Sequence, residues 1–233
     1  MNFENKIISG LFVKRYKRFF ADIKLKNKTV TAHCANSGSM MGLLNKNNKV
    51  WITKSNNKKR KLKYTLQVIE DKNSKVGVNT HLTNKIVNHA LEKNLINTFS
   101  KKVKIKSEQV FGSNTRFDFY LEDKNTKIFL EVKNVTLKRK DKTAEFPDSV
   151  TSRGTKHLNE LMNAVKKGFK AYLLFVVQRN DCDRFEIAKD IDPVYSETLI
   201  KAVKNKVKIL CYDCKFSPKG ITINNKIKFQ ING

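Results

Sequence analysis

The sequence predicts an α/β protein with an all-β N-terminal part, in which an OB-like barrel precedes an α/β domain. Within the first 80 residues, short apolar segments alternate with Asn-, Gly- and Ser-rich connections, as in a small barrel. Beyond that point, helical spacing of apolar residues alternates with strand patterns. A continuous apolar run at 171–177 is typical of a strand buried on both faces. We therefore expect a barrel domain over 1–80 and an α/β domain over 81–233.

The composition is that of a folded protein. The chain has 233 residues with 39% hydrophobic content, enough to bury a core, and this argues against disorder. No apolar run approaches the ~20 residues of a membrane span, and the first residues lack a signal-peptide pattern. Four cysteines do not make a disulfide framework. We expect a cytoplasmic protein with no membrane partner.

The formal net charge of +27 favours a polyanionic partner, and DNA is the one we expect. Basic side chains that neutralise phosphates release counterions, which makes binding strong and dependent on salt. A second interpretation is compositional. The chain is rich in both Lys and Asn, as A/T-biased coding would produce throughout a protein. Charge alone therefore leaves a non-specific DNA binder open.

The strands of the barrel are predicted from period-two alternation. The segment 11–26 alternates along its whole length and predicts one strand, and further strands are expected at 30–34, 50–54 and 62–70. A linker is expected around 76–79. In the first strand, Arg15, Lys17 and Arg18 are interleaved with aromatic residues. OB-like barrels bind nucleic acid with cations and stacked aromatics, so these three cations are candidate DNA contacts.

The α/β part is predicted in order. A helix over 81–95, with Thr80 as its N-cap, precedes strands at 116–121 and 127–135. A helix over 155–167 that ends at Gly168 leads into the strand at 171–177. A strand, a helix and a buried strand in this order imply a right-handed parallel crossover. A helix over 193–205 and a strand over 207–212 complete the domain.

Two carboxylates and a lysine form the candidate catalytic site. Asp118 lies mid-strand, and its neighbours Phe117 and Phe119 are expected on the opposite face. Glu131 and Lys133 share one face of the next strand, so Asp118 and Glu131 can converge if the strands pair.

Mg²⁺ and Mn²⁺ are bound in proteins by carboxylate oxygens. We therefore expect Asp118 and Glu131 to be ligands of one of these metals. Lys133 could then orient a water and stabilise charge on a phosphate. The alternative is a pair of exposed cross-strand ion pairs, in which Asp118 meets Arg116 and Glu131 meets Lys133.

Other polar residues are candidate DNA contacts. Arg153 and Lys156, with His157 beside them, lie at the start of a predicted helix, where cations and free N–H groups suit a phosphate. Ordinary capping and solvation is the alternative. Gln178 follows the buried strand, where polar groups often face a site; a simple strand-end turn is equally compatible.

Two cysteine-containing motifs are not interpreted as metal sites. His33 and Cys34 are adjacent and should point to opposite faces of a strand, which favours a structured turn. Cys211 and Cys214 form a lone CxxC, whereas structural zinc needs four ligands.

Several long motifs occur in an order that resembles one known family. The segments are RYKRFFADI (15–23), TAHCANSGSM (31–40), VGVNT (76–80), EVKNVTL (131–137), FPDSVTSRGTKHLNEL (146–161) and VVQRND (176–181). Together they closely resemble the bacterial sugar fermentation stimulation protein A family over essentially the whole chain.

The resemblance implies a fold, a site and a function. The expected fold is an OB-like barrel joined to a domain of the PD-(D/E)xK nuclease type, with Asp118, Glu131 and Lys133 as the counterparts of the nuclease signature. It also implies DNA binding linked to regulation of sugar (maltose) metabolism. The chain departs from the family's pattern at Thr115, Ala35, Leu43 and His89.

The departure at His89 concerns the metal site, because His89 stands where the first helix often carries a glutamate. Glu92 is out of register to replace that glutamate. Two functions thus remain open: a metal-dependent nuclease, or a non-catalytic DNA-binding regulator.

Overall fold

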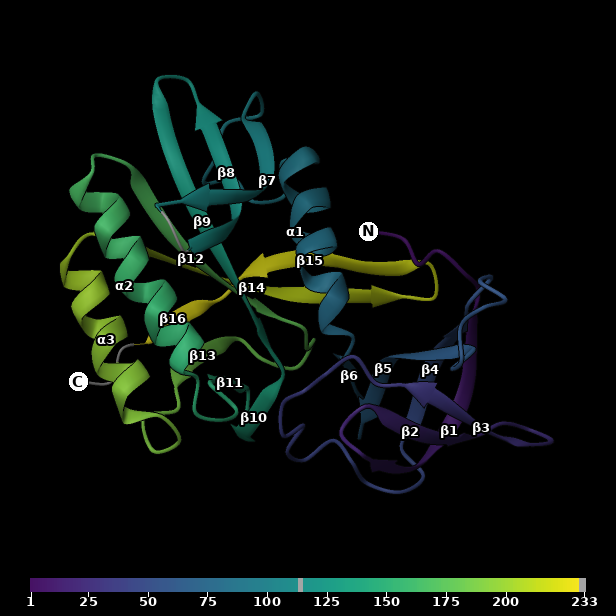
Figure 1. Ribbon diagram of the computed structural model, residues 1–233. Coiled ribbons are helices and arrows are strands. Elements are labelled where there is room, and N and C mark those ends of the chain that lie inside the picture. Colours follow the sequence, from purple (N-terminus) through teal and green to yellow (C-terminus); the bar gives the residue numbers. More distant parts are fainter. Residues whose placement is uncertain (113–114, 231–233) are drawn as a thin grey trace.

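The computed structural model describes residues 1–112 and 115–230 as two parts that meet along one side (Figure 1). The described residues form an α/β structure with an all-β N-terminal part, which confirms the predicted fold class. Among these residues, no helix is long and apolar enough to cross a membrane.

The N-terminal part is a closed barrel. Its strands are β1 (Ile7–Tyr16), β2 (Phe20–Lys24), β3 (Thr29–His33), β4 (Lys49–Lys54), β5 (Tyr64–Asp71) and β6 (Ser74–Gly77). They lie in the order β3-β2-β1-β4-β5-β6, and a parallel pairing of β3 with β5 closes the sheet on itself. Apolar side chains from these strands, such as Phe12, Ile23 and Leu66, fill the interior.

Two sequence predictions for the barrel are wrong. The single strand expected over 11–26 is a hairpin of β1 and β2, in which Lys17 and Arg18 adopt positive φ angles of 44° and 63°. Neither residue type favours that backbone region, so the turn carried no sequence signal. The linker expected at 76–79 is partly strand, because β6 pairs with the end of β5.

The C-terminal part is built on a mixed six-stranded sheet in the order β15-β14-β12-β9-β8-β7. The strands are β7 (Lys104–Phe111), β8 (Thr115–Asp123), β9 (Thr126–Val135), β12 (Lys170–Val177), β14 (Lys208–Ser217) and β15 (Gly220–Lys226). The helices are η1 (Thr80–Leu82), α1 (Thr83–Glu92), α2 (Ser152–Lys166) and α3 (Pro193–Lys204). A small second sheet contains β10 (Leu137–Lys140), β11 (Thr143–Phe146), β13 (Arg184–Ile187) and β16 (Lys228–Gln230).

Both faces of the large sheet are covered, as the apolar run of β12 predicts. Leu174 on β12 packs into a cluster with α1, whereas Leu173 and Phe175 pack with α2 and α3 on the other face. Strand β12 lies parallel to β9, so the expected parallel crossover through α2 is confirmed. The sequence did not predict β7, although it forms one edge of this sheet.

The helix starts differ from their predictions. The first predicted helix begins as the 3-10 turn η1, whose cap is the side chain of Asn79, and α1 follows from Thr83. Helix α2 starts at Ser152, three residues earlier than predicted, because the Thr151 hydroxyl accepts from the Gly154 N–H and caps it. The predicted stop at Gly168 is confirmed, with φ of 86°.

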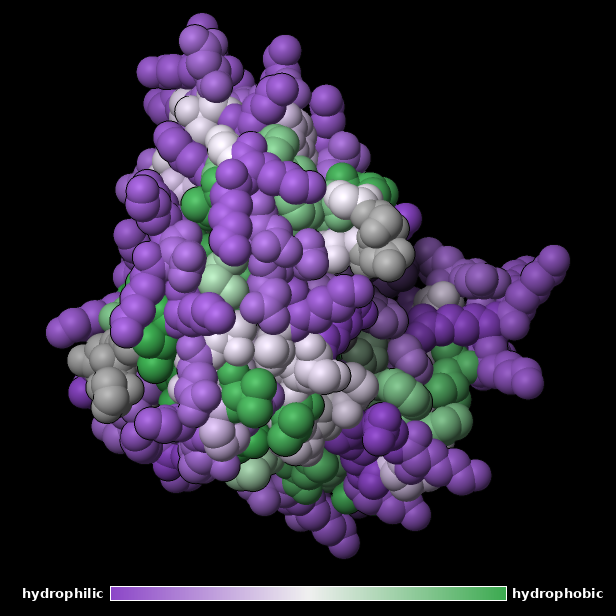
Figure 2. Space-filling view, turned by 60° about the vertical axis from the view of Figure 1, so that its left-hand side comes forward, coloured by the Kyte–Doolittle hydropathy of each residue, from purple (hydrophilic) through white to green (hydrophobic). Residues whose placement is uncertain are grey.

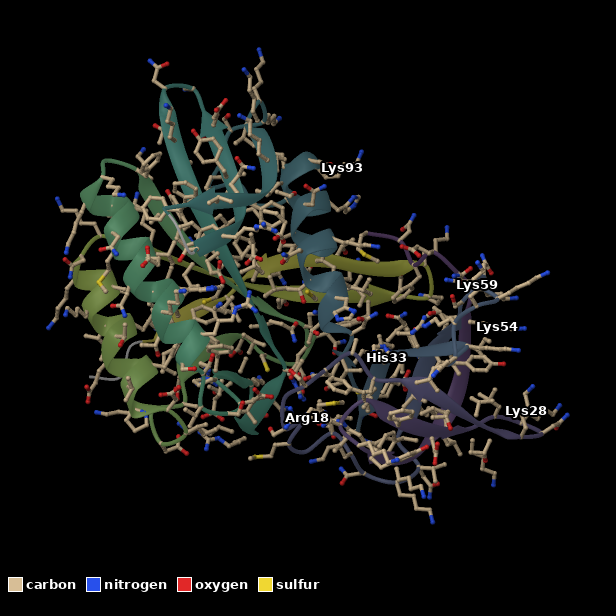
Figure 3. All side chains as sticks on the ribbon, in the orientation of Figure 1. Arg18, Lys28, His33, Lys54, Lys59 and Lys93 are labelled. Carbon is tan, nitrogen blue, oxygen red and sulfur yellow. The ribbon has the colours of Figure 1, made fainter. Side chains whose placement is uncertain are left out.

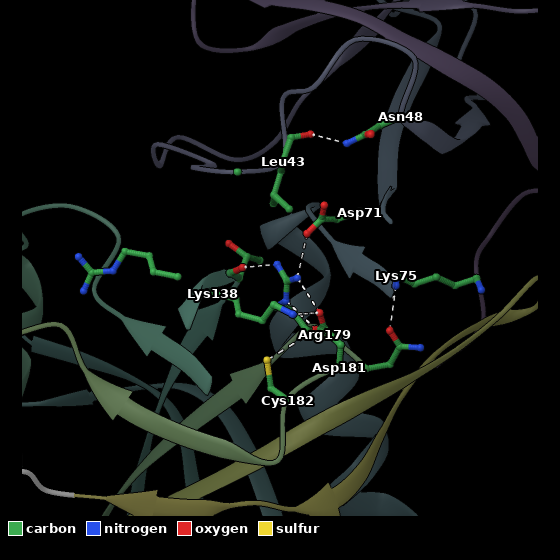
Figure 4. A network of polar contacts seen from close by, with 12 residues as sticks. Leu43, Asn48, Asp71, Lys75, Lys138, Arg179, Asp181 and Cys182 are labelled. Carbon is green, nitrogen blue, oxygen red and sulfur yellow. Dashed lines mark hydrogen bonds and ion pairs between the residues drawn. The ribbon is translucent and has the colours of Figure 1, made fainter. Parts of the chain in front are cut away.

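A buried cluster of charged groups joins the two parts (Figure 4). The guanidinium of Arg179, 1% exposed, donates to both oxygens of Asp181 at 2.8 and 2.9 Å. It also donates to Asp71 of the barrel at 3.2 Å and to the Thr136 carbonyl at 3.1 Å. The Lys138 amine lies 2.7 Å from Asp181.

Backbone bonds extend the junction beside this cluster. The Gly77 N–H donates to the Gln178 carbonyl at 2.8 Å, and the Lys75 N–H donates to the Asn180 side chain at 2.8 Å. The segment after β12, which the sequence left open as a simple strand-end turn, therefore fastens the barrel to the α/β part.

The outer face that Figure 2 presents is mainly hydrophilic, with apolar residues gathered in its lower half. This distribution agrees with the 30% charged content of the chain.

Candidate functional site

The predicted carboxylates lie between α1 and α2, where β8 and β9 separate. The β8–β9 ladder runs from Asp123↔Thr126 to Phe119↔Leu130. At the next position, the Asp118 carboxylate accepts from the Val132 N–H at 2.8 Å, where a strand carbonyl would otherwise be expected. The side chain thus caps the free edge of β9 and is fixed beside Glu131.

The strand twists at this separation, and one sequence prediction is wrong as a result. Phe117 and Phe119 do not share a face: Phe117 packs against Phe129 on the α2 side, and Phe119 packs in the α1 cluster. Asp118 lies between them and is partly exposed.

Asp118 is held from α1 as well. The Asn84 amide donates to its other oxygen at 2.8 Å. Burial, and then the negative charge of Glu131, raise the pKa of the Asp118 carboxyl to about 6, against the Asn84 and Val132 hydrogen bonds that lower it. The two carboxylates are therefore close enough to repel each other.

Glu131 is almost completely buried, and its two oxygens differ. Its Oε1 accepts from the Lys133 amine at 2.7 Å and contacts Nδ1 of His157. Its Oε2 has no hydrogen-bond partner among the described residues. Burial raises the pKa of Glu131, but the contacts with His157 and Lys133 outweigh that effect and hold the pKa below its usual value.

Of the two surface ion pairs in the alternative interpretation, the structure excludes the one between Asp118 and Arg116. Arg116 is exposed and lies 3.8 Å from Glu108, so it does not neutralise Asp118. Lys133 does pair with Glu131, as the alternative expected, but Glu131 is buried and Lys133 partly buried, with exposed fractions of 3% and 14%. The pair is therefore not an exposed surface ion pair, and it lies beside a second carboxylate, an arrangement that is common at functional sites.

Three further side chains lie at the site: Asn84 and Tyr195 were not predicted from the sequence, and His157 was considered only beside the candidate phosphate contacts of α2. Asn84 and His157 touch the carboxylates directly. Tyr195 of α3 is fully buried, and its hydroxyl has no partner among the described residues. Burial, and then the charges of Glu131 and Asp192, raise the pKa of Tyr195. For His157, the available sequence signal is helical spacing: it lies four positions before Leu161 and so shares the buried apolar face of α2, whereas Lys156 does not.

The predicted DNA contacts of the barrel fall into two groups. Arg15 is partly buried, and its guanidinium donates to the carbonyls of Arg18, Asn36 and Gly38 at 2.7–3.0 Å. It therefore holds the loop after β3 in place. Lys17 and Arg18 are exposed at the β1–β2 turn beside that loop. Figure 3 shows Arg18 at the lower end of the space between the barrel and the α/β part.

The predicted DNA contacts of the α/β part also differ from one another. Arg153 and Lys156 are exposed on the first two turns of α2, the helix whose His157 contacts Glu131. Gln178 is fully buried and bonds to Asn134 at 2.5 Å and Thr83 at 3.1 Å, so this side chain does not reach the surface. We interpret Gln178 as a support between β9, β12 and α1.

The cysteine motifs agree with their structural interpretation. Cys34 is buried with its sulfur 3.6 Å from that of Met40, while His33 faces a pocket. Cys211 and Cys214 are buried and unbonded. Within residues 1–112 and 115–230, no group of three or more His, Cys, Asp or Glu side chains is arranged to hold a metal.

Two family models match the chain. Residues 13–78 match the SfsA N-terminal OB domain, and residues 81–220 match the sugar fermentation stimulation protein RE domain.

Similar proteins are found along the whole length. A sugar fermentation stimulation protein homolog of Pelagibacter ubique is 54% identical, with 98% of each chain covered. A homolog of Maricaulis maris is 42% identical over all of both chains. The structure of Pyrococcus furiosus SfsA, solved in complex with Ca²⁺, has a similar fold, with a TM-score of 0.88 at 24% identity over 99% of this chain and 98% of that one.

Proposed function

This chain belongs to the sugar fermentation stimulation protein family, and we propose that it binds DNA and hydrolyses phosphodiester bonds at a divalent-metal site formed by Asp118 and Glu131. The observation that carries the proposal is the buried, unpartnered Oε2 of Glu131 beside Asp118. An orphaned buried carboxylate oxygen is unfavourable unless a cation or a water completes it.

The donor set suits a hard divalent cation. Carboxylate oxygens of Asp118 and Glu131 are ligands of the kind that Mg²⁺ and Mn²⁺ take, and such ions fill their remaining positions with water and substrate oxygens. Burial, and then repulsion by Glu131, raise the pKa of Asp118 to about 6, and a divalent charge would offset that repulsion. The Ca²⁺ held by the Pyrococcus furiosus relative makes a divalent cation the first ligand to test here.

Each side chain has a defined task in this proposal. When bound, the metal would polarise a phosphoryl oxygen and lower the pKa of a water. Lys133, within 2.7 Å of Glu131, orients the attacking water and stabilises negative charge on the phosphate. Asn84 and the Val132 N–H fix the direction of the Asp118 carboxylate. His157 holds Glu131 from the α2 side.

The surrounding surface supports DNA as the substrate. Arg153 and Lys156 on α2 and Lys17 and Arg18 on the barrel provide exposed cations on both parts. Figure 3 shows Arg18 where the barrel approaches the α/β part. The formal net charge of +27 also favours binding to a polyanion such as DNA. Contacts of this kind bind phosphates without reading sequence, so binding should weaken steeply with salt.

The test is cleavage of linear, circular and single-stranded DNA with Mg²⁺, Mn²⁺ or a chelator. We expect metal-dependent cutting that Asp118→Asn reduces by roughly a thousandfold or more, since several kcal/mol of transition-state stabilisation are lost. Glu122→Gln removes a partly exposed carboxylate from the same strand and should cut as the wild type does. No cutting by the wild-type protein with any of the metals would refute the proposed hydrolysis.

A non-catalytic DNA-binding regulator of sugar (maltose) metabolism genes is the second candidate. It is favoured by one observation: α1 presents the amide of Asn84 to Asp118, and the described residues offer no third acidic, His or Cys ligand. Salt-sensitive DNA binding without cutting, and without dependence on Asp118, would support this function.

A further inference from the structure

A second pocket lies where the barrel meets α1, away from the carboxylates. It has a volume of about 420 Å³. We call it the junction pocket, and its defining residues are His33, Arg60, Gln67, Asn79, His81 and Lys85. Figure 3 shows His33 between the barrel strands and the lower end of α1. The proposed hydrolysis assigns no role to these residues.

Two imidazole rings, those of His33 and His81, lie in the wall of the pocket, and the ring of Phe19 stacks on His33 from outside the lining. The rings of Phe19 and His33 are stacked, with centroids 6.3 Å apart and planes at 22°, and His81 continues the row 6.2 Å from His33. Phe19 is 42% exposed, and His81 is also exposed. In the part of the chain that the structure describes, neither imidazole donates or accepts a hydrogen bond, so their faces and edges are available.

The imidazole of His33 is neutral near pH 7. Burial, and then the charges of Arg60 and His81, lower its pKa. A neutral ring can lie flat against another π-system without a desolvated charge. The His33 ring is therefore suited to stacking rather than to pairing with an anion.

The floor of the pocket is polar and specifically arranged. The Gln67 amide donates to the Thr53 hydroxyl at 2.8 Å and accepts from the Asn79 amide at 2.8 Å. Asn79 in turn accepts from the His81 N–H at 3.2 Å. Each carboxamide nitrogen uses one of its two hydrogens in these bonds, so donors and acceptors remain for a ligand with a mixed hydrogen-bonding edge. A nucleobase has such an edge.

Cations flank the pocket on two sides. Arg60 belongs to the β4–β5 loop, which also carries the cations Lys58, Lys59, Lys61 and Lys63. Lys85 of α1 lies on the other side, in an exposed ion pair with Glu4 at 2.7 Å that costs little to open. The pocket thus combines stacking rings, a polar floor and flanking positive charge, which are the features of a site for unpaired nucleotides.

A shared residue connects this pocket to the carboxylates. Lys85 also lines the groove that contains Asn84, His89 and Asp118. The path from the rings to Asp118 therefore runs along one face of α1.

We propose that the junction pocket binds an unpaired nucleotide of single-stranded DNA. Its base lies against His33 and His81 above the Gln67–Asn79 floor, and the strand continues past Lys85 towards Asp118. This direction of the strand rests on the proposed hydrolysis at Asp118, whereas binding in the pocket does not. Duplex DNA keeps its bases stacked and paired, so the pocket selects single strands.

The test compares how tightly the protein binds two labelled ligands: an oligothymidylate of about ten nucleotides and a DNA duplex with the same number of phosphates. Both affinities are measured by fluorescence anisotropy in the presence of a chelator. We expect His81→Ala to weaken single-strand binding roughly tenfold and to leave duplex binding almost unchanged. His81→Phe keeps a stacking ring and should bind as the wild type does. Lys28→Ala, on the far tip of the barrel in Figure 3, removes one exposed charge and should affect both ligands equally.

Three results would overturn the proposal. The first is an equal loss of duplex and single-strand binding in His81→Ala. The second is a His81→Phe variant that binds single strands as weakly as His81→Ala. The third is displacement of the oligonucleotide by free thymidine monophosphate at the same nucleotide concentration. The last would make this a mononucleotide site. Because the measurement is made without metal, a protein that never cuts DNA can still confirm the pocket, and a protein that cuts can still refute it.

Discussion

Two clusters of buried charge lie in this protein, and they are completed to different degrees. At the junction of the two parts, the Arg179 guanidinium meets Asp181, Asp71 and the Thr136 carbonyl, and Lys138 adds a second cation. At the candidate site, the Oε2 of Glu131 has no partner among the described residues, and the repulsion from Glu131 helps to raise the pKa of Asp118.

The two clusters differ in whether every buried charge is paired. Buried charges stabilise only when each is paired and hydrogen-bonded, and the junction cluster meets that condition. The site cluster meets it only in part, since Lys133 and His157 both contact the same oxygen of Glu131. Polar capacity left over in a buried place is a feature of a site that awaits a ligand.

The largest effect should come from breaking the closed cluster. Arg179→Ala leaves Asp181 and Asp71 without their shared cation, and we expect the free energy of unfolding to fall by about 3–5 kcal/mol. Denaturant unfolding would measure the change. Arg184→Ala breaks an exposed pair with Asp183 and should cost at most about 1 kcal/mol. Equal effects of the two variants would contradict the structural role of Arg179.

The cluster of Asp118 and Glu131 should be stabilised when a divalent metal binds. At a free concentration one hundred times the Kd, a divalent ion should stabilise the wild-type protein by about 2.7 kcal/mol. Thermal unfolding with Ca²⁺, Mg²⁺ or Mn²⁺ would detect this. The Asp118→Asn variant should lose the metal response yet be at least as stable as the wild type without metal, because it removes one of two repelling charges. A large loss of stability in that variant would show that the Asp118 charge is structural.

The smallest effect should be the acid response of the junction. Burial raises the pKa of Asp181, but hydrogen bonds from Arg179 and Lys138 outweigh it and hold the pKa well below the usual value. A lowered pKa contributes stability that is present above the unfolded-state pKa of about 4 and is lost as the pH falls below it. Between about pH 5 and pH 3, the wild-type protein should lose stability more steeply than Asp181→Asn. Parallel curves would remove Asp181 from the account of acid unfolding.

Local backbone geometry explains the features that could be predicted from the amino-acid sequence. The two-residue period of a strand placed Glu131 and Lys133 on one face, and the continuous apolar run predicted that β12 is buried on both faces. Gly168 marked the end of α2 because its positive φ suits glycine. The order of the main helices and buried strands followed from the same periodicities.

The side chains that complete each cluster come from distant parts of the chain and depend on packing. Asn84 reaches Asp118 from 34 positions away, and His157 reaches Glu131 from 26 positions away. Such contacts depend on how α1 and α2 pack on the sheet, which no local pattern encodes. The twist between Phe117 and Phe119 and the turn at Lys17 and Arg18 were missed for the same reason, since neighbouring strands impose them against the local preference of those residues. Local geometry thus set the pair Glu131–Lys133, and packing set its surroundings.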